Sequence, residues 1–228
     1  PVATGLRRAD RTGPPPNISF SMRACVSLFT GLAVLICPVL FGGMAPQPVG
    51  DVLSLARHDR GVELTCTDGA TVTCSVLAPD LIRIRARFAG QPEAPDHSWA
   101  IARTDWPASP WQLTETTEAV SLATSELAVV VQRSPLLISF RDPGTGRVIN
   151  TDARPMARDA ATGRLEVAKR LGLEERFYGL GEKAAPLDKR RGAFTLWNSD
   201  TPGYVAGTDP IYQSIPFYLG CEDGQAYG

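Results

Sequence analysis

The sequence predicts an all-β protein built as an antiparallel β-sandwich. After residue 50, apolar and polar residues alternate over short runs, which is the periodicity of half-buried strands. These runs recur at intervals of roughly 8 to 12 residues, with turn-forming residues between them. The 228 residues include 21 glycines and 19 prolines, which favours frequent turns over long helices. A complete (β/α)8 barrel, which needs roughly 250 residues, does not fit in the chain.

The strands are predicted from the alternating runs. In order, they are 62–66, 70–77, 81–88, 111–116, 119–124, 126–132, 136–140 and 147–151. In the run 81–88, the arginines at positions 83, 85 and 87 share one face and the apolar residues between them share the other. We interpret the arginine face as solvated, with a row of anion contacts as the alternative. The segment 161–176 is a candidate helix, although Gly172 makes a strand and a loop equally acceptable.

Cysteine spacing gives no sign of a metal site. The five cysteines lie at positions 25, 37, 66, 74 and 221, without a C-x-x-C or H-x-x-x-H spacing, so we expect no metal or cofactor. A two-residue turn at Asp68-Gly69 would place Cys66 opposite Thr71 and Cys74 opposite Glu63. Both cysteines are therefore predicted to be buried strand residues without a disulfide.

Charge and histidine content exclude some classes of function. The 23 basic and 24 acidic residues give a net charge of −1, so there is no basic field to attract nucleic acid. The two histidines, His58 and His97, fall in predicted loops or strand ends. This position disfavours a Ser-His-Asp or Cys-His nucleophile.

Residues 1–50 are predicted to be a disordered leader, ahead of a sandwich domain at 51–228. The stretch 1–21 has no initiating methionine and contains three consecutive prolines. From Met22, one arginine precedes an uncharged apolar run, so 22–43 is a candidate signal or anchor segment, with an untranslated or non-native leader as the alternative. The protein is expected to be cytoplasmic if 1–50 is not native, and secreted or periplasmic if Met22 starts a signal peptide.

From residue 176 onward the chain becomes rich in aromatic residues, glycine and carboxylates. Aromatic faces beside fixed polar groups suit a sugar, which has apolar C–H faces and a rim of hydroxyls. The Gly179-Leu180-Gly181 pattern lacks the third glycine of a dinucleotide-binding loop, because position 184 is alanine. A sugar site is therefore the favoured interpretation of this segment.

Three motifs in this segment resemble one enzyme family. They are RFYGLGEK (176–183), FTLWNSD (194–200) and TDPIYQSIPFY (208–218). They resemble the end of the N-terminal, galactose mutarotase-like β-sandwich domain of glycoside hydrolase family 31, the α-glucosidase family. The resemblance covers residues 50–228 and implies that a (β/α)8 barrel follows in the intact protein. Aspartates of that barrel would supply the nucleophile and the general acid/base of a retaining glycosidase. The chain is thus expected to be truncated at its C-terminal end, before the catalytic residues.

The resemblance also implies which residues of this chain touch the substrate. A loop of the sandwich would reach the barrel's pocket, where Asp200 would bind sugar. Asn198, Trp197 and Tyr212 are its weaker neighbours. The alternative for Asp200 is a turn carboxylate that caps residues 201–203. Glu182 and Asp200 are the best carboxylate pair in the chain, but the resemblance assigns catalysis to residues beyond 228, so no catalytic residue is expected here.

The expected function is the N-terminal portion of an enzyme that hydrolyses terminal α-linked glucosyl residues with retention. The chain would complete the substrate pocket, with an oligosaccharide or α-glucoside and the C-terminal barrel as its partners. One alternative is a stand-alone carbohydrate-binding sandwich that uses Trp197, Tyr204 and Tyr212. Another is an α-xylosidase or α-galactosidase of the same family.

Overall fold

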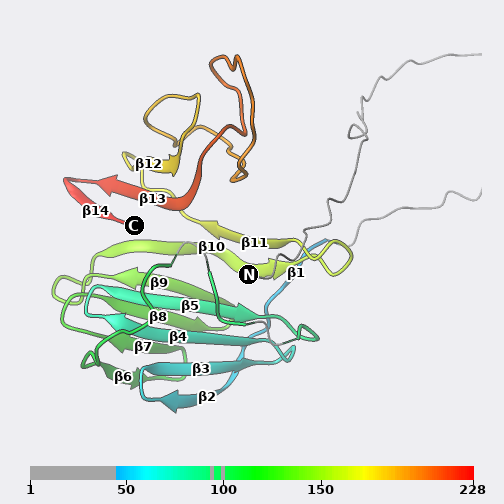
Figure 1. Ribbon diagram of the computed structural model, residues 1–228. Coiled ribbons are helices and arrows are strands. Elements are labelled where there is room, and N and C mark those ends of the chain that lie inside the picture. The colour runs from blue at the N-terminus through cyan, green and yellow to red at the C-terminus, as the bar shows by residue number, and fades with distance from the viewer. Residues whose placement is uncertain (1–44, 93–94, 99–100) are drawn as a thin grey trace, which may run out of the picture. The chain divides into compact units, whose positions relative to one another are not determined.

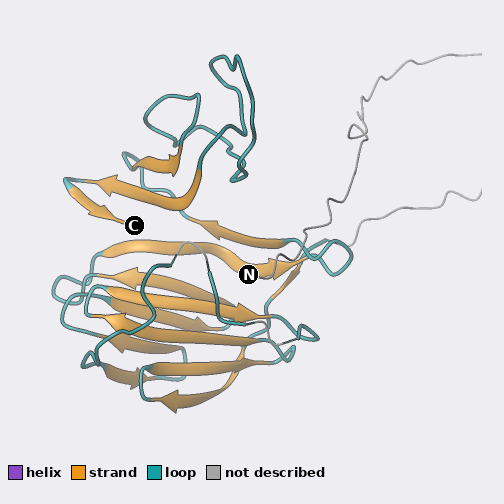
Figure 2. Ribbon diagram, viewed as in Figure 1, coloured by secondary structure: helices purple, strands orange, loops and turns teal. Residues whose placement is uncertain are grey.

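The computed structural model describes residues 45–228 apart from 93–94 and 99–100. The candidate signal or anchor segment 22–43 lies outside the described residues. Figure 2 shows strands and loops throughout the described part of the chain. Across that part, there is no helix with the length and apolar character needed to cross a membrane.

The strands form three antiparallel sheets within the described residues (Figure 1). The strands are β1 (Gln47–Pro48), β2 (Val52–His58), β3 (Gly61–Cys66), β4 (Thr71–Ala78), β5 (Leu81–Arg87), β6 (Gln112–Glu115), β7 (Ala119–Ala123), β8 (Ala128–Arg133), β9 (Leu136–Arg141), β10 (Val148–Arg158), β11 (Leu165–Lys169), β12 (Arg176–Gly181), β13 (Ser214–Glu222) and β14 (Gln225–Tyr227). One sheet has the order β2-β3-β4-β5, and the largest has the order β1-β10-β9-β8-β7-β6 with β11 also paired to β10. The third sheet has the order β12-β13-β14. The predicted all-β class is confirmed.

The core lies between the four-stranded and the seven-stranded sheets. Alternate residues of each strand point into it, as the period-2 pattern requires. Leu64 from β3 and Leu122 from β7 are fully buried within one continuous apolar cluster. In β5, Ile82 is buried while Arg83 and Arg87 are exposed, which agrees with the predicted division of its two faces.

The pairing of β3 with β4 corrects the predicted register. Cys74 lies opposite Val62, not Glu63, and Thr71 lies opposite Thr65. The loop holds three residues, because the N–H of Cys66 donates to the carbonyl of Ala70 at 2.8 Å. Its last residue, Gly69, has a φ of +83°, which suits the left-handed final position of a three-residue hairpin loop. Cys66 and Cys74 are nevertheless free and buried, as predicted.

The candidate helix at 161–176 resolves into a strand and a loop. Residues 165–169 form β11, which pairs with β10. The register of this pairing shifts twice, between Asp152 and Arg154 and between Arg154 and Ala157. Strand pairing thus prevails over the weak helical pattern, and the strand-and-loop alternative is the correct one.

The three-stranded sheet is joined to the seven-stranded sheet by a buried polar contact. The Tyr227 hydroxyl donates to Glu175 Oε1 at 2.5 Å and accepts a hydrogen bond from Asn150 Nδ2 at 3.2 Å. The other oxygen of Glu175 accepts the N–H of Gly172 at 2.8 Å. Burial and the hydrogen bond to Glu175 raise the pKa of Tyr227. Asn150 belongs to β10 and Tyr227 to β14, so this contact connects the two sheets.

Replacing a core leucine should destabilise the sandwich. Leu64→Ala removes a fully buried side chain, and we expect the free energy of unfolding to fall by about 2–5 kcal/mol. Leu53→Ala on β2 is the matched control, because Leu53 is 67% exposed, and it should change stability by less than about 0.5 kcal/mol. Urea denaturation followed by circular dichroism measures both. Equal losses in the two variants would contradict the proposed core.

Removing one hydroxyl should weaken the contact between the two sheets. Tyr227→Phe leaves Glu175 Oε1 without its donor in a buried site, which should cost about 1–3 kcal/mol of unfolding free energy. Tyr178→Phe is the control, since the hydroxyl of Tyr178 donates to no residue in the described part of the chain. Thermal denaturation at pH 7 compares the two. A Tyr227→Phe protein as stable as the control would argue against this role.

Candidate functional site

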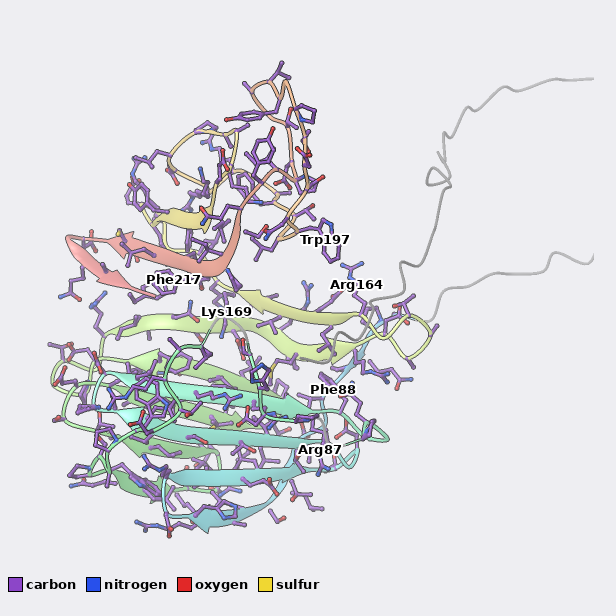
Figure 3. All side chains as sticks on the ribbon, in the orientation of Figure 1. Arg87, Phe88, Arg164, Lys169, Trp197 and Phe217 are labelled. Carbon is purple, nitrogen blue, oxygen red and sulfur yellow. The ribbon has the colours of Figure 1, made fainter. Side chains whose placement is uncertain are left out.

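All residues implied to contact sugar lie on one long loop, residues 182–213, between β12 and β13. The loop rises from the three-stranded sheet, and Trp197 on it is labelled in Figure 3. Loops of this length without secondary structure of their own are usually functional or disordered. The geometry at its base shows how this one is held.

Two glycines set the direction in which the loop leaves β12. Gly179 has a φ of +110° and Gly181 a φ of +79°, which side chains rarely tolerate. A Cβ atom at Gly179 would lie 2.8 Å from the carbonyl oxygen of Phe217, and one at Gly181 would lie 2.7 Å from that of Gln213. The pairing of β12 with β13 shifts between these glycines. The glycine pair is therefore explained by this shift in register and by a close approach of two backbones.

A buried ion pair closes the base of the loop. Lys183 Nζ lies 2.8 Å from Asp209 Oδ1, and only 1% of the lysine side chain is exposed. The same ammonium donates to the carbonyl of Thr195 at 2.6 Å, and the N–H of Thr195 donates to the other oxygen of Asp209. The hydrogen bond from Lys183 is the main cause that lowers the pKa of Asp209 below its ordinary value of 3.8. Three distant parts of the loop are thus fixed together.

Further hydrogen bonds align the two limbs of the loop. The N–H of Ser199 donates to the carbonyl of Ile211 at 3.0 Å, and Ile211 is buried. The side-chain oxygen of Asn198 accepts the N–H of Ser214 at 2.8 Å. The Tyr212 hydroxyl donates to the carbonyl of Thr201 at 2.9 Å. Asn198 therefore has a structural partner, at the start of β13.

The outer side of the loop exposes aromatic rings near carboxylates. Tyr204 and Tyr212 pack edge to face, with ring centroids 5.9 Å apart. Partial burial raises the pKa of Tyr212, and the negative charges of Asp200 and Glu182 add to this effect. The structure thus brings Asp200, Tyr204 and Tyr212 together, with Glu182 close by.

Trp197 and Asp200 are both free to contact a ligand. Trp197 is 70% exposed and makes no ring contact within the described residues. The Asp200 carboxylate is exposed, and no hydrogen bond or ion pair joins it to the rest of the described chain. The alternative role as a cap for residues 201–203 therefore has no hydrogen bond to support it. Exposed rings beside an unpaired carboxylate can stack on a sugar and accept its hydroxyl hydrogens.

Sequence reasoning missed the residues that hold the loop in place. Asp209 lies 26 positions after Lys183, and no local pattern links them. The only available signal is general: a lysine is almost never fully buried without an acidic partner, so a buried Lys183 would imply a distant acid. Among the described residues, no three or more His, Cys, Asp or Glu side chains lie together in a group that could hold a metal ion.

These features define a class of protein: an antiparallel β-sandwich bearing a small extra sheet and a long aromatic loop held by an ion pair and hydrogen bonds. The family model for the glycosyl hydrolase 31 N-terminal galactose mutarotase-like domain matches residues 71–228. The chain therefore belongs to glycoside hydrolase family 31, through this N-terminal domain. The resemblance seen in the three motifs is confirmed.

Individual relatives are enzymes of which this chain covers a small part. It is 33% identical over 115 residues to alpha-glucosidase 2 of Bacillus thermoamyloliquefaciens, which is 50% of this chain and 14% of that protein. It is 44% identical over 62 residues to an alpha-glucosidase of Saccharolobus solfataricus, which is 27% of this chain and 9% of that protein. The chain thus spans less than a fifth of either curated relative.

Solved structures show the same fold. A family 31 dextranase from Flavobacterium johnsoniae, determined with isomaltotriose, matches with a TM-score of 0.69 and 25% identity over 76% of this chain and 21% of that chain. The cycloalternan-forming enzyme of Listeria monocytogenes matches with a TM-score of 0.61 and 18% identity over 76% of this chain and 16% of that chain, which shows the fold alone.

Breaking the buried ion pair should destabilise the protein in a pH-dependent way. Asp209→Asn leaves the Lys183 ammonium buried and unpaired, which should cost about 3 kcal/mol at pH 7. Because the pKa of Asp209 is lowered in the folded state, its contribution is complete above pH 3.8 and is lost as the pH falls through the folded-state value. The stability difference between wild type and variant should therefore shrink below pH 3.8.

Urea denaturation at several pH values between 7 and 2 checks this prediction. Asp80→Asn, in the exposed turn between β4 and β5, is the control for removing one carboxylate. A difference for Asp209→Asn that stays constant across the whole pH range would show that the ion pair does not stabilise the loop.

Proposed function

We propose that this chain is the N-terminal sandwich of a retaining α-glucosidase-type enzyme, and that its loop 182–213 completes the substrate pocket. The observation behind the proposal is the unpaired Asp200 carboxylate beside Tyr212, on a loop fixed by the Lys183–Asp209 ion pair. A rigid loop can hold a hydroxyl acceptor in place without an entropic cost at each binding event. The alpha-glucosidases and the dextranase among its relatives support this choice of substrate class.

Exposed apolar side chains on the three-stranded sheet favour contact with a partner domain. Ile215, Phe217 and Leu219 alternate along β13, and all three are exposed. Phe217 is labelled on this strand in Figure 3. Leu165 and Val167 on β11 are also exposed. An apolar surface of this kind fits an interface with another domain, which under this proposal is the catalytic barrel.

The barrel would perform the chemistry and the sandwich loop would position the sugar. A retaining glycosidase uses two carboxyl groups, one as nucleophile and one as general acid/base. Under the proposal both belong to the barrel. Asp200 would accept hydrogen bonds from substrate hydroxyls, and the tyrosine pair would pack against the sugar's C–H face.

The gene and one variant test the proposal. The reading frame should continue past codon 228 into a βα-repeating stretch, and the complete product should hydrolyse p-nitrophenyl α-glucoside. In that product, Asp200→Ala should lower kcat/KM about 10- to 100-fold, because a charged hydrogen bond to substrate contributes about 1.5–3 kcal/mol. Glu126→Ala, an exposed carboxylate on the sandwich, should leave kcat/KM unchanged.

The same test distinguishes the proposed function from activity on other substrates and from a non-enzymatic role. Greater activity on p-nitrophenyl α-xyloside or α-galactoside would replace the proposed substrate while keeping the enzyme class. A frame that stops at codon 228 would favour the carbohydrate-binding alternative, for which the exposure of Trp197 is the specific observation. Full activity in Asp200→Ala would refute the role of this loop in the pocket.

A further inference from the structure

A polar groove lies on the seven-stranded sheet, on the face turned away from the core. Val129, Val131 and Ile138 point into the core, so their neighbours Val130 and Ser139 point outward. The groove has a volume of about 750 Å³ and lies over β7 to β10. This volume is within the range of small-molecule sites, roughly 300–1,000 Å³.

Short side chains form the floor of this groove. Ser139 lies opposite Val130 on one neighbouring strand and opposite Thr151 on the other. Ala119 lies one row further along, opposite Gln132. Small side chains in adjacent rows leave a hollow, and the serine and threonine hydroxyls line it with hydrogen-bonding groups.

The two ends of the groove differ in charge. Glu118 stands at one end, next to Ala119, whereas Arg141 stands at the other. Leu137, in the row of Ala119, and Arg141 are four residue steps apart along β9, so their Cα atoms lie roughly 13 Å apart. Arg170 enters from the loop after β11, where its N–H donates to the carbonyl of Thr151 at 2.9 Å.

Most other charges in the groove are already paired. Arg133 lies 3.0 Å from Glu115, and Asp152 lies 2.6 Å from Lys169. Arg141 reaches only the Ser139 hydroxyl, at 3.5 Å. No carboxylate of the described chain forms an ion pair with Arg141 or Arg170. Two guanidinium groups without an ion-pair partner therefore line the groove together with Glu118, whose carboxylate accepts a hydrogen bond from the Thr117 hydroxyl at 2.5 Å and forms no ion pair in the described chain.

We propose that this groove binds an acidic saccharide. Its carboxylate would lie at Arg141 and Arg170, since guanidinium groups bind carboxylates in a bidentate way. Its hydroxyls would donate to Glu118 and Gln132 at the far end. A neutral sugar would leave both guanidinium groups unused, and a plain anion would leave Glu118 unused. The choice of a saccharide among acidic molecules rests on the proposed sugar-handling function.

Calorimetric titration of the full chain with sodium glucuronate tests the proposal. Glucuronate should bind at least about tenfold more tightly than glucose or sodium acetate, because only glucuronate engages both ends of the groove. Arg141→Ala and Arg170→Ala should each weaken glucuronate binding at least about tenfold. Arg141→Lys should also weaken it, since lysine keeps the charge but loses the guanidinium fork.

Matched variants separate specific binding from general charge effects. Arg87→Ala, on the exposed face of β5, removes an equivalent charge from the other sheet and should leave the affinity unchanged. Glu118→Gln should weaken glucuronate binding but not acetate binding, because only the sugar has hydroxyls to donate. Unchanged melting temperatures of these variants confirm that each is folded.

Several results would overturn the proposal. Equal affinity for glucose and glucuronate would remove the role of the two arginines, and equal affinity for acetate would reduce the groove to a simple anion site. An affinity unaffected by Arg141→Ala and Arg170→Ala would place binding elsewhere. Asp200→Ala should not alter glucuronate binding, so failure of the α-glucosidase proposal and failure of this one are distinguishable.

Discussion

The position of the three-stranded sheet depends on the buried carboxylate of Glu175. One of its oxygens accepts the Tyr227 hydroxyl and the other accepts the N–H of Gly172. Arg190, from the loop 182–213, donates to the backbone carbonyls of both Glu175 and Gly172. A buried carboxylate without partners is costly. The position of the sheet that gives Glu175 both of these donors is therefore strongly favoured over positions that would leave its oxygens without a hydrogen bond. The candidate site is thus positioned through polar contacts, while the sandwich beneath it is held by apolar burial.

The sandwich could be predicted from the sequence because its residues alternate with a period of two. Runs such as 81–88 have one apolar face and one polar face, and the structure places strands there with the expected sides buried. The predicted register of β3 against β4 is wrong by one residue, because the sequence does not distinguish a two-residue loop from a three-residue loop that ends in Gly69. Alternation fixes which face is buried, and turn geometry fixes which residues are opposite one another.

The candidate site was less predictable, because its geometry depends on contacts between distant residues. The motifs pointed to the loop 182–213 and to Asp200, yet the pairing of Lys183 with Asp209 has no local signature. The same is true of Asn150, which lies on β10 and meets Tyr227 of β14. Polar contacts of this kind follow from the tertiary fold, so they can be recognised only once the strands are in place.

The pairing of β1 with β10 has a consequence for the order of folding. Gln47 pairs with Arg158 and Pro48 with Ala157. Most of the sandwich sequence therefore separates the first strand of the described chain from the strand with which it pairs. Closing so long a loop costs entropy before any contact compensates for it, and folds dominated by distant pairings form slowly. During synthesis, β1 has no partner until residue 158 has left the ribosome. The hairpins β2–β5 and β6–β9, whose partners are adjacent in sequence, can form before that moment, and β1 then completes the edge of the sheet.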